Sequence, residues 1–512
     1  MTRHPARAAY ALATVLALGL TAACGSGADD GKEAGAAGKL ALGTFFGAQT
    51  NFNPWLSPTG DNPTLQVHQM VYDSLTQVDP DGKVTPALAT SWEFTDPTTL
   101  VVKLRDGVKF DDGTPLDANA VKANFDYASK AVPAGPYAKY FAQITTTVVD
   151  ETTVELKSKA PQPDLPTDFA IGGGFIVNPK ALKAPSGLKG KPDGTGPYTL
   201  AHSVQGQRYD FTRRKDYWDA KQYPYQSVQL KNFSSPQALE NAMKAGQLQG
   251  GQAATPKTLP ALHSAGLTVH RSAPTTLGGI WLSDRAGKIV PALGKVKVRQ
   301  ALNHAIDRAA IHKAATPGVG APGSLIVPKG LPGYSAETDA KYTYDPAKAK
   351  KLLVEAGYPD GFTLPVLAGG DNDVASQAVA GYLRKIGVEV KLEGHANDYV
   401  NQLYSGKWAA AASAMAMVPT VQSLTALLAP DGSGNFNHSV DPEIQALLTK
   451  AQTASAAEQA DAVEELVKKV NDEAWFLITA HNQNVYLTGK DVTCDIGQRS
   501  VCPMYTFRPA EQ

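Results

Sequence analysis

The sequence predicts an α/β fold with at least two lobes, on three observations. The chain has 512 residues, and a single hydrophobic core rarely grows beyond roughly 250 to 300 residues. Residues 91–116 alternate apolar and polar side chains between Asp-Gly and Asp-Pro pairs, which is typical of a β-meander. From Lys295 onward, helical patterns alternate with short apolar stretches, which indicates a sheet covered by helices.

The N-terminus has the features of an export signal. Arg3 and Arg7 precede an uncharged run over residues 8–23, the layout of a signal peptide, and this run is shorter than the roughly 20 residues that span a membrane. Residues 21–24, Thr-Ala-Ala-Cys, resemble the bacterial lipobox, in which the signal peptide is cut before a cysteine that bears lipid. The interpretation is a signal peptide over 1–23 and a lipidated Cys24. The alternative is an ordinary signal peptide with a leftover cysteine, although a free thiol is a liability in an oxidising compartment.

Residues 24–38 predict a flexible tether, because Gly, Ala and alternating charges cannot bury enough apolar surface to fold. The expected location is therefore extracytoplasmic, at the outer face of the cell membrane, with the membrane contacted through the lipid. The net charge of the chain indicates no nucleic-acid partner and no binding to an anionic membrane surface. Lysine plus arginine equals aspartate plus glutamate at 48 each, and removal of Arg3 and Arg7 leaves 46 against 48, a net charge of −2. This balance favours neither nucleic acid nor an anionic membrane surface.

Cys494 and Cys502 lie close together with Gly497 between them. Outside the cytosol a disulfide is the first interpretation. Two sulfurs without a nearby His or Cys pair make a poor metal site. We also interpret Asp111 and Asp112 as turn residues, because no late Glu completes a calcium loop. We expect neither a metal nor a cofactor.

The elements are predicted in order from local signals. A buried strand is expected over residues 40–49 and a helix over 64–75, where apolar residues recur at helical spacing. A second helix over 118–130 has Asp117 as its N-cap. Residues 194–200, GTGPYTL, form a glycine turn that enters a strand and lack the spacing of a phosphate-binding loop. Asp345 and Pro346 begin a helix that Gly357 ends, and a last helix spans 456–472.

Several stretches, in order, resemble one protein family. The longest is VYDSLTQVDPDGKVTPALATSWEFTDPTTLVVKLRDGVKFDDGTPLDANAVKANFDYA, and it is followed by GTGPY, by Tyr217-Trp218, by VRQALNHAIDR, YDPAKAKKLLVEAGY and IGVEVKLE, and by NHSVDPEIQALLTKA. From about Lys39 to the C-terminus the chain is similar to the extracytoplasmic solute-binding proteins of the peptide, oligopeptide and nickel type (family 5), which feed ABC importers.

The resemblance implies a two-lobed, periplasmic-binding-protein-like fold of type II, cluster C, with two crossover strands as a hinge. Lobe one would comprise residues 39–280, with a β-rich subdomain at about 76–190, lobe two residues 281–480, and residues 481–512 would return to lobe one. The crossovers are expected near residues 278–284 and 476–486. The implied function is a monomeric binding protein that closes on an oligopeptide or a similarly sized organic solute and delivers it to an ABC permease and its ATPase.

The same resemblance directs attention to residues 408–424. In peptide-binding relatives this segment contains an Asp that pairs with the amino terminus of the peptide, whereas here no acidic residue precedes Asp431. A buried ammonium without a counter-charge is costly, so capture of free-amino peptides in the usual way is in doubt. An adaptable apolar surface is offered instead by Met415, Met417 and Val418. The alternative is that both methionines pack in the hydrophobic core.

The other ligand-binding candidates come by position, and aromatic and amide groups of this kind line pockets. They are Phe45, Phe46, Gln49, Asn53, Trp55, Trp281 and His481. For each aromatic residue, the alternative interpretation is packing in the hydrophobic core. For His481, the alternative is a structural role in the hinge. His395 has no accompanying His or Cys cluster for a nickel site.

Two other functions are alternatives to transport. A secreted hydrolase would need a nucleophile motif, and we find neither G-x-S-x-G nor H-E-x-x-H, so no catalytic residue is expected. A surface receptor that senses a ligand without transport would have the same fold.

Overall fold

The computed structural model describes residues 37–44, 52–56, 64–130, 141–183, 188, 191–253, 256–369, 373–395, 398–418, 420–455 and 457–511. The predicted signal peptide, Cys24 and most of the predicted tether lie outside this part of the chain. Residues Ala37–Gln512 form one compact unit. Within the described ranges, no helix is both long enough and apolar enough to cross a membrane.

The first lobe is built around a seven-stranded sheet. Its elements are β1 (Ala37–Thr44), η1 (Pro54–Leu56), α1 (Thr64–Val71), β8 (Tyr198–Val204), β9 (Arg208–Arg213), η3 (Ala220–Gln222), β10 (Tyr225–Asn232), α7 (Pro236–Lys244), β11 (Gly250–Ala253), η4 (Pro256–Thr258), α8 (Leu259–Ser264), β12 (Thr268–Arg271) and β19 (Val485–Thr488). The strand order is β12-β19-β11-β1-β10-β9-β8. β1 runs parallel to β10 and β11. Leu40 and Leu42 of β1 are fully buried, as expected for a central strand.

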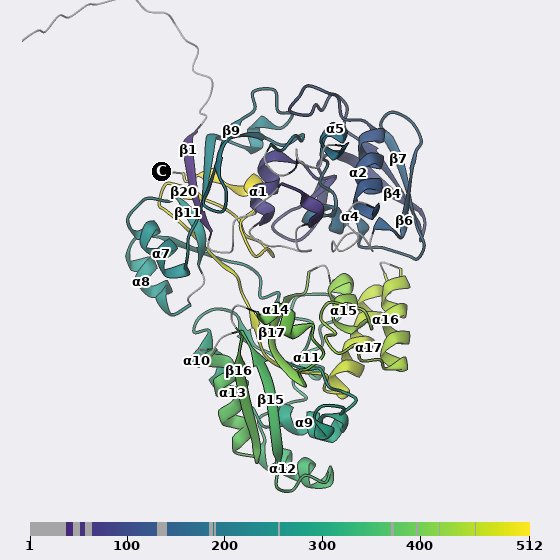
Figure 1. Cartoon of the computed structure of the whole chain (residues 1–512), viewed down its shortest axis with the longest axis vertical. Coiled ribbons are helices and arrows are strands. Elements are labelled where there is room, and N and C mark those ends of the chain that lie inside the picture. Colours follow the sequence, from purple (N-terminus) through teal and green to yellow (C-terminus); the bar gives the residue numbers. More distant parts are fainter. Residues whose placement is uncertain are drawn as a thin grey trace, which may run out of the picture. The chain divides into compact units, whose positions relative to one another are not determined.

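The C-terminal segment belongs to this lobe. After β19 come β20 (Val492–Thr493), η6 (Met504–Thr506) and β21 (Arg508–Pro509), and Figure 1 shows this yellow segment next to β1 and β11. Cys494 and Cys502 form a disulfide with their Cα atoms 6.1 Å apart. Both cysteines pack in the same hydrophobic cluster as Leu40 and Leu42, so the disulfide closes a short loop of the C-terminal segment that packs against the core of the first lobe.

A β-rich subdomain is inserted between α1 and β8. It contains β2 (Thr76–Val78), β3 (Val84–Pro86), β4 (Ala89–Asp96), β5 (Thr99–Leu104), α2 (Ala118–Lys130), β6 (Ile144–Val148), β7 (Thr153–Ser158), α4 (Leu165–Asp168), η2 (Phe169–Gly173) and α5 (Pro179–Lys183). The strands β4, β5, β7 and β6 form a four-stranded sheet in that order, and β2 pairs with β3. The predicted meander is confirmed at β4 and β5, which pair antiparallel.

The second lobe contains a six-stranded sheet and most of the helices described. Its elements are β13 (Thr276–Leu282), η5 (Pro291–Gly294), α9 (Val296–His304), α10 (Arg308–Ala315), β14 (Ala321–Pro322), α11 (Ala336–Asp339), α12 (Pro346–Glu355), β15 (Phe362–Ala368), α13 (Val374–Arg384), β16 (Val388–Gly394), α14 (Tyr399–Leu403), β17 (Ala410–Ala416), α15 (Thr420–Leu428), α16 (Pro442–Thr453), α17 (Gln459–Asp472) and β18 (Phe476–Asn482). The strand order is β14-β18-β13-β17-β15-β16, and β15 runs parallel to β16 and β17.

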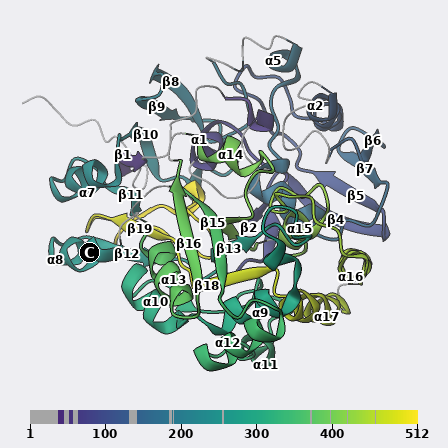
Figure 2. The same ribbon diagram turned by 60° about the horizontal axis from the view of Figure 1, so that its bottom comes forward.

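Helices cover both faces of this second sheet, and strand alternation decides which residue faces which layer. Ile280 and Leu282 of β13 pack in one cluster with residues of α9, α12 and α13. Leu277 and Trp281 of the same strand pack in another cluster with residues of α15, α16 and α17. Figures 1 and 2 show α10 and α13 on one side of the strands and α15, α16 and α17 on the other. The prediction of a sheet covered by helices is therefore confirmed.

The chain passes between the two sheets twice. Residues 272–275 connect β12 of the first sheet to β13 of the second, and residues 483–484 connect β18 of the second sheet to β19 of the first. Residues 278–284, expected near the first crossover, therefore form most of β13 inside the second sheet. The two connections are hydrogen bonded to each other, since the Asn484 N–H donates to Ser272 Oγ over 2.8 Å and the Ser272 N–H donates to the Asn484 carbonyl over 2.9 Å.

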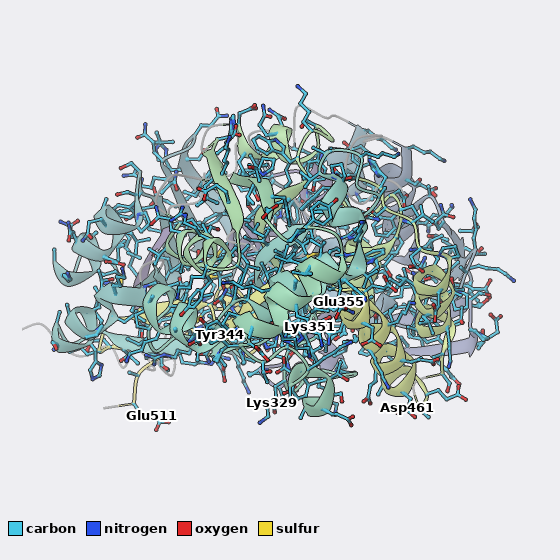
Figure 3. The ribbon with its side chains drawn as sticks, turned by 90° about the horizontal axis from the view of Figure 1, so that it is seen from below. Lys329, Tyr344, Lys351, Glu355, Asp461 and Glu511 are labelled. Carbon is cyan, nitrogen blue, oxygen red and sulfur yellow. A yellow bond between two sulfur atoms is a disulfide. The ribbon has the colours of Figure 1, made fainter. Side chains whose placement is uncertain are left out.

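The helix ends follow the predicted caps. The Ala120 N–H donates to Asp117 Oδ1 over 2.8 Å, and the Lys348 N–H donates to Asp345 Oδ1 over 2.8 Å. Gly357 follows α12 with φ +84°, the left-handed conformation of a helix C-terminus. The last helix begins at Gln459, three residues later than predicted. The outer side chains of these helices are charged, and Figure 3 shows Lys351 and Glu355 of α12 and Asp461 of α17 at the surface.

Candidate ligand-binding site

A pocket of about 720 Å³ lies on the second lobe, where the parallel strands β15 and β17 end. Ligands of open α/β sheets bind outside the carboxyl ends of the strands. The pocket is lined by β13, β17 and β18 of the second sheet, by α10 and the residues after it, and by the start of α13. Its position and size are those of a small-molecule site.

Small residues form the floor of this pocket. Gly278 and Gly279 of β13 lie between Ala412, Ser413 and Ala414 of β17 on one side and β18 on the other. A Cβ at Gly279 would lie 2.4 Å from the Leu477 carbonyl oxygen. The absence of large side chains on three neighbouring strands is what leaves room for a ligand.

A carboxylate marks one side of the pocket. Asp373 is the N-cap of α13 and accepts hydrogen bonds from the N–H groups of Ala375 and Ser376, over 3.1 and 3.3 Å, and from the Ser376 hydroxyl. Tyr399 of α14 also lines the pocket. Its hydroxyl donates a hydrogen bond to the Ala412 carbonyl. Burial raises the pKa of the Tyr399 hydroxyl, so this group is a neutral donor at physiological pH.

Two further polar groups in the pocket have unused hydrogen-bonding capacity. Within the described part of the chain, Asn482 Oδ1 and Thr316 Oγ1 are buried without a partner, and both residues line the pocket. Buried polar atoms are nearly always hydrogen bonded. Next to the pocket, both atoms therefore have unused capacity to accept a hydrogen bond.

The predicted apolar candidates lie on the other face of the same strands. Met415 pairs with Leu277 across the sheet, and Met415, Met417 and Trp281 belong to the cluster that packs against α15, α16 and α17. Met417 and Trp281 are fully buried, and Met415 and Val418 are half-buried. Met415 does not line the pocket and packs against this hydrophobic cluster instead.

His481 has a structural position. Its side chain is buried, its Nε2 is 2.8 Å from the Leu325 carbonyl oxygen, and burial lowers its pKa. A Cβ at Gly323 would lie 2.4 Å from the imidazole ring. The ring is thus enclosed by the loop around Gly323, whereas its neighbours Ala480 and Asn482 line the pocket.

The first-lobe candidates fall into two groups. Phe45, Phe46 and Gln49 lie outside the described residues. Asn53 and Trp55 are both buried, and Asn53 Oδ1 accepts a hydrogen bond from the Trp55 N–H over 3.0 Å. Trp55 packs in the subdomain core and makes an edge-to-face contact with Phe141, with ring centroids 5.5 Å apart.

Sequence reasoning therefore missed the residues that line the pocket. Small side chains and a helix N-cap carry no chemical motif. The available signal was the run of alanine and serine in residues 409–414, which lies within the segment 408–424 to which the resemblance directs attention. The described residues contain no group of three or more His, Cys, Asp or Glu that could hold a metal ion.

Comparison with known proteins identifies the family. Residues 83–435 match the model for bacterial extracellular solute-binding proteins, family 5. The glutathione-binding protein GsiB of Salmonella paratyphi A is 32% identical over 349 residues, which cover 66% of this chain and 66% of that protein. The chain thus aligns with slightly less than two thirds of the length of this relative.

Solved structures show the same fold. The substrate-binding protein CtaP of Listeria monocytogenes superimposes with a TM-score of 0.80 at 22% identity, over 93% of this chain and 100% of that one. DppA of Helicobacter pylori, in complex with the peptide STSA, gives a TM-score of 0.79 at 20% identity, over 93% and 98% of the two chains. The two-lobed fold expected from the sequence is confirmed, and the chain belongs to the bacterial extracellular solute-binding proteins of family 5.

Proposed function

We propose that this protein is the substrate-binding lipoprotein of an ABC importer and that it captures a compact, peptide-like solute with a free amino group. The observation that carries the proposal is the pocket on the second lobe, with a floor of small residues and a carboxylate, Asp373, on its wall. The match to family 5 supports the transport role. A binding protein that delivers its ligand unchanged needs no catalytic residue, and none is proposed.

The volume of the pocket favours a solute of about tripeptide size. A space of about 720 Å³ lies within the roughly 300 to 1,000 Å³ of small-molecule sites. Glutathione is a tripeptide with one ammonium and two carboxylates, and the relative in Salmonella paratyphi A is named a glutathione-binding protein. We therefore propose glutathione or a similar short peptide as the ligand class.

Asp373 supplies the counter-charge that residues 408–424 lack. The resemblance leads us to expect an Asp in that segment, whereas here residues 414–418 are Ala, Met, Ala, Met and Val. An ammonium leaving water needs a charged or well-bonded partner. Asp373 keeps its cap hydrogen bonds to α13 while its carboxylate borders the pocket, so one carboxylate orients the helix and the solute together.

Delivery follows from closure of the two lobes about the connections at residues 272–275 and 483–484. A ligand shifts the population toward the closed state only by its greater affinity for that state. In this proposal lobe one spans residues 39–280 and 481–512, lobe two spans residues 281–480, and the permease recognises the closed form. Lipidation of Cys24 would hold the protein at the outer face of the membrane.

Calorimetric titration of residues 37–512 with glutathione tests the proposal. We expect one saturable site, and Asp373→Asn should weaken binding by about tenfold, because Asn still caps the helix but lacks the charge. N-acetylated glutathione should bind the parent protein as weakly as glutathione binds the variant. Asp360→Asn, the same change at an exposed position, is the matched control. Absence of glutathione binding would overturn the ligand class, and equal affinity of Asp373→Asn would overturn the role of Asp373.

A further inference from the structure

A second pocket, of about 690 Å³, lies at the other end of β13 from the first. The residues that follow β13, from Ser283 to Ile289, form one wall, and Trp475 and Glu473, just before β18, form another. The first pocket uses the earlier part of β13, at Gly278 to Ile280. The two pockets share no lining residue, so they are separate sites.

Arg285 is the unusual residue of this second pocket. Its guanidinium lies over the Trp475 ring, with Cζ 3.9 Å from the ring centroid and 5.2 Å from that of Phe476. Nη1 donates to Asn435 Oδ1 over 3.1 Å. Within the described part of the chain, Nε and Nη2 are buried and have no hydrogen-bond partner. Burial lowers the pKa of Arg285 well below its ordinary value, and the nearby Arg299 adds to this effect.

The two unpartnered nitrogens of Arg285 form one edge of the guanidinium. Nε and Nη2 together make the side-on fork that matches the two oxygens of a carboxylate or phosphate. A third donor is available in the same pocket, because Ser283 is 2% exposed and its hydroxyl is buried without a partner in the described residues. Three unused donors thus line one pocket, whereas buried polar groups are nearly always paired.

The carboxylates that line this pocket have other partners within the chain. Asp284 accepts hydrogen bonds from the N–H groups of Lys288, Ile289 and Val290, over 2.8, 2.7 and 2.6 Å. Asp441 caps α16 by accepting from two backbone N–H groups at 2.9 and 3.1 Å.

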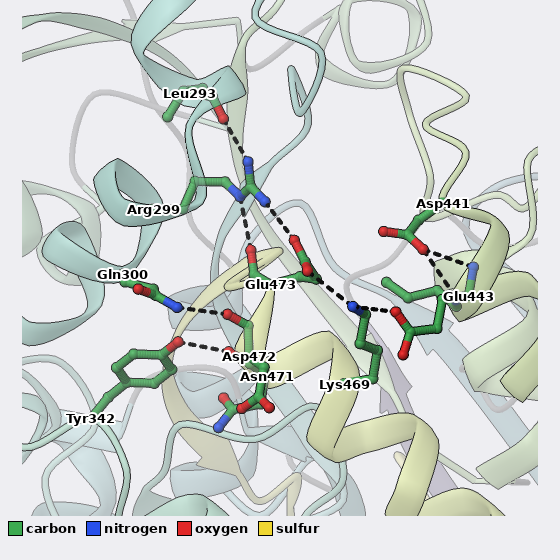
Figure 4. A network of polar contacts seen from close by, with 11 residues as sticks. Leu293, Arg299, Gln300, Tyr342, Asp441, Glu443, Lys469, Asn471, Asp472 and Glu473 are labelled. Carbon is green, nitrogen blue, oxygen red and sulfur yellow. Dashed lines mark hydrogen bonds and ion pairs between the residues drawn. The ribbon is translucent and has the colours of Figure 1, made fainter. Parts of the chain in front are cut away.

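The third lining carboxylate, Glu473, pairs with Arg299 over 3.3 Å and with Lys469 over 3.1 Å. Figure 4 shows this connected network, in which Lys469 also contacts Glu443. Among the described residues, none of these three carboxylates is an ion-pair partner of Arg285, so an anion from outside the chain could take that place.

We propose that the pocket around Arg285 is a second ligand site, which binds a small oxyanion, a carboxylate or a phosphate, through Nε and Nη2 of Arg285 and the hydroxyl of Ser283. Stacking on Trp475 holds the plane of the guanidinium in place and pre-organises the fork for a bidentate partner. The ligand supplies the negative charge and the acceptor atoms that the surrounding residues do not. This site is independent of the proposed transport ligand.

Calorimetric titration of residues 37–512 with acetate, succinate and inorganic phosphate, each at constant ionic strength set with chloride, tests the proposal. We expect saturable one-to-one binding of at least one of the three anions, and their relative affinities distinguish a carboxylate site from a phosphate site. Arg285→Gln should weaken that binding by about tenfold and Ser283→Ala by about threefold.

Two variants and one control keep the result interpretable. Arg285→Lys retains the charge but lacks the fork, so it should also lose most of the affinity. Lys350→Gln removes an exposed cation of α12 that does not line the pocket and should change the affinity by less than twofold. Urea unfolding of each variant reports on folding and should give the cooperative transition of the parent. No saturable binding by any anion, or binding that Arg285→Gln and Ser283→Ala leave intact, would overturn the proposal.

Discussion

At the residue scale, Asp73 connects two segments that lie far apart in the sequence. Each of them carries part of the resemblance to the family. Tyr217 donates its hydroxyl to Asp73 Oδ1 over 2.7 Å, and Trp218 Nε1 donates to Asp73 Oδ2 over 3.0 Å. The guanidinium of Arg105 lies 4.2 Å above the Trp218 ring. Asp73 is fully enclosed, and this burial raises its pKa to about 6, while the hydrogen bonds from Trp218 and Tyr217 act in the opposite direction. The acidic residue of the first segment thus anchors the Tyr-Trp pair of the second.

The raised pKa of Asp73 predicts a pH effect on stability. Because an unfolded aspartate has a pKa near 3.9, the folded state binds this proton more readily. The stabilisation from Asp73 should be fully present below about pH 4 and be lost as pH rises through 6. For a pKa shift of this order, Asp73 contributes about 3 kcal/mol to the free energy of unfolding. The measurement is urea unfolding at pH 4 and pH 7 of the parent and of Asp73→Asn, which cannot titrate.

The difference in unfolding free energy between parent and Asp73→Asn should grow in favour of the parent from pH 7 to pH 4. Other carboxylates change equally in both proteins, so the comparison isolates Asp73. Asp106→Asn, at an exposed aspartate in the same subdomain, should follow the parent at both pH values. Parallel profiles for the parent and Asp73→Asn would contradict the prediction.

Two buried tryptophans show what sequence reasoning cannot decide at this scale. Trp55 and Trp281 were candidates for ligand contact, and both are enclosed in hydrophobic clusters. An aromatic side chain serves a core or a pocket equally well. The choice depends on which face of the neighbouring elements it meets, and that is a tertiary property.

At the element scale, β17 contributes residues to two parts of the lobe. Ala412, Ser413 and Ala414 line the pocket, whereas Met415 packs against the hydrophobic cluster formed with α15, α16 and α17. This arrangement predicts that Ala414→Leu weakens glutathione binding by at least about tenfold, because the larger side chain fills the floor of the pocket. Its unfolding free energy should change by less than about 1 kcal/mol, since Ala414 is exposed.

Met415→Leu is the matched comparison on the same strand. It conserves volume, so it should cost less than about 1.5 kcal/mol of stability and leave glutathione affinity within twofold. Calorimetric titration and urea unfolding of both variants check this pair. Loss of binding in Met415→Leu with intact binding in Ala414→Leu would place the ligand on the methionine face instead.

Elements with local signals were predicted well from the sequence. The Asp117 and Asp345 caps and Gly357 define helix ends through hydrogen bonds and backbone conformation that involve only near neighbours. The turn at residues 194–200 was predicted, but its glycines are required by a tertiary contact that the sequence does not reveal. A Cβ at Gly194 or Gly196 would lie 2.2 or 2.4 Å from backbone atoms of Val71, so these glycines let the turn lie against the end of α1.

At the scale of the whole molecule, the sequence predicted the fold better than the site. Length and the two patterns of periodicity determine the two sheets and their helices. The pocket depends instead on Gly278, Ala414 and Asn482, which three different strands bring together. The sequence contains these residues without any feature that marks their convergence, and the unpartnered atoms of Arg285 are visible only once its neighbours are known.

The connections between the sheets are held by a glutamine that bonds to both sides. Gln483 Nε2 donates to the Ser272 carbonyl over 2.7 Å, and the Gly320 N–H donates to Gln483 Oε1 over 3.0 Å. Ser272 follows β12 of the first lobe, and Gly320 precedes β14 of the second. Each such hydrogen bond contributes about 1 kcal/mol, which is comparable to the free-energy differences that separate conformations of a two-state protein.

Gln483→Ala should therefore widen the range of inter-lobe distances in the ligand-free protein and weaken glutathione binding several-fold, because a smaller fraction of molecules has the binding-competent arrangement. The pocket itself is unchanged, since Gln483 does not line it. Single-molecule fluorescence energy transfer between dyes on the two lobes measures the distribution, and saturating glutathione should restore the narrow distribution of the parent. Gln207→Ala, at an exposed glutamine of the first lobe, controls for the substitution. If Gln483→Ala and Gln207→Ala give the same distribution and affinity as the parent, then the side chain of Gln483 does not limit hinge motion, and the backbone hydrogen bonds between residues 272 and 484 alone set the freedom of the lobes.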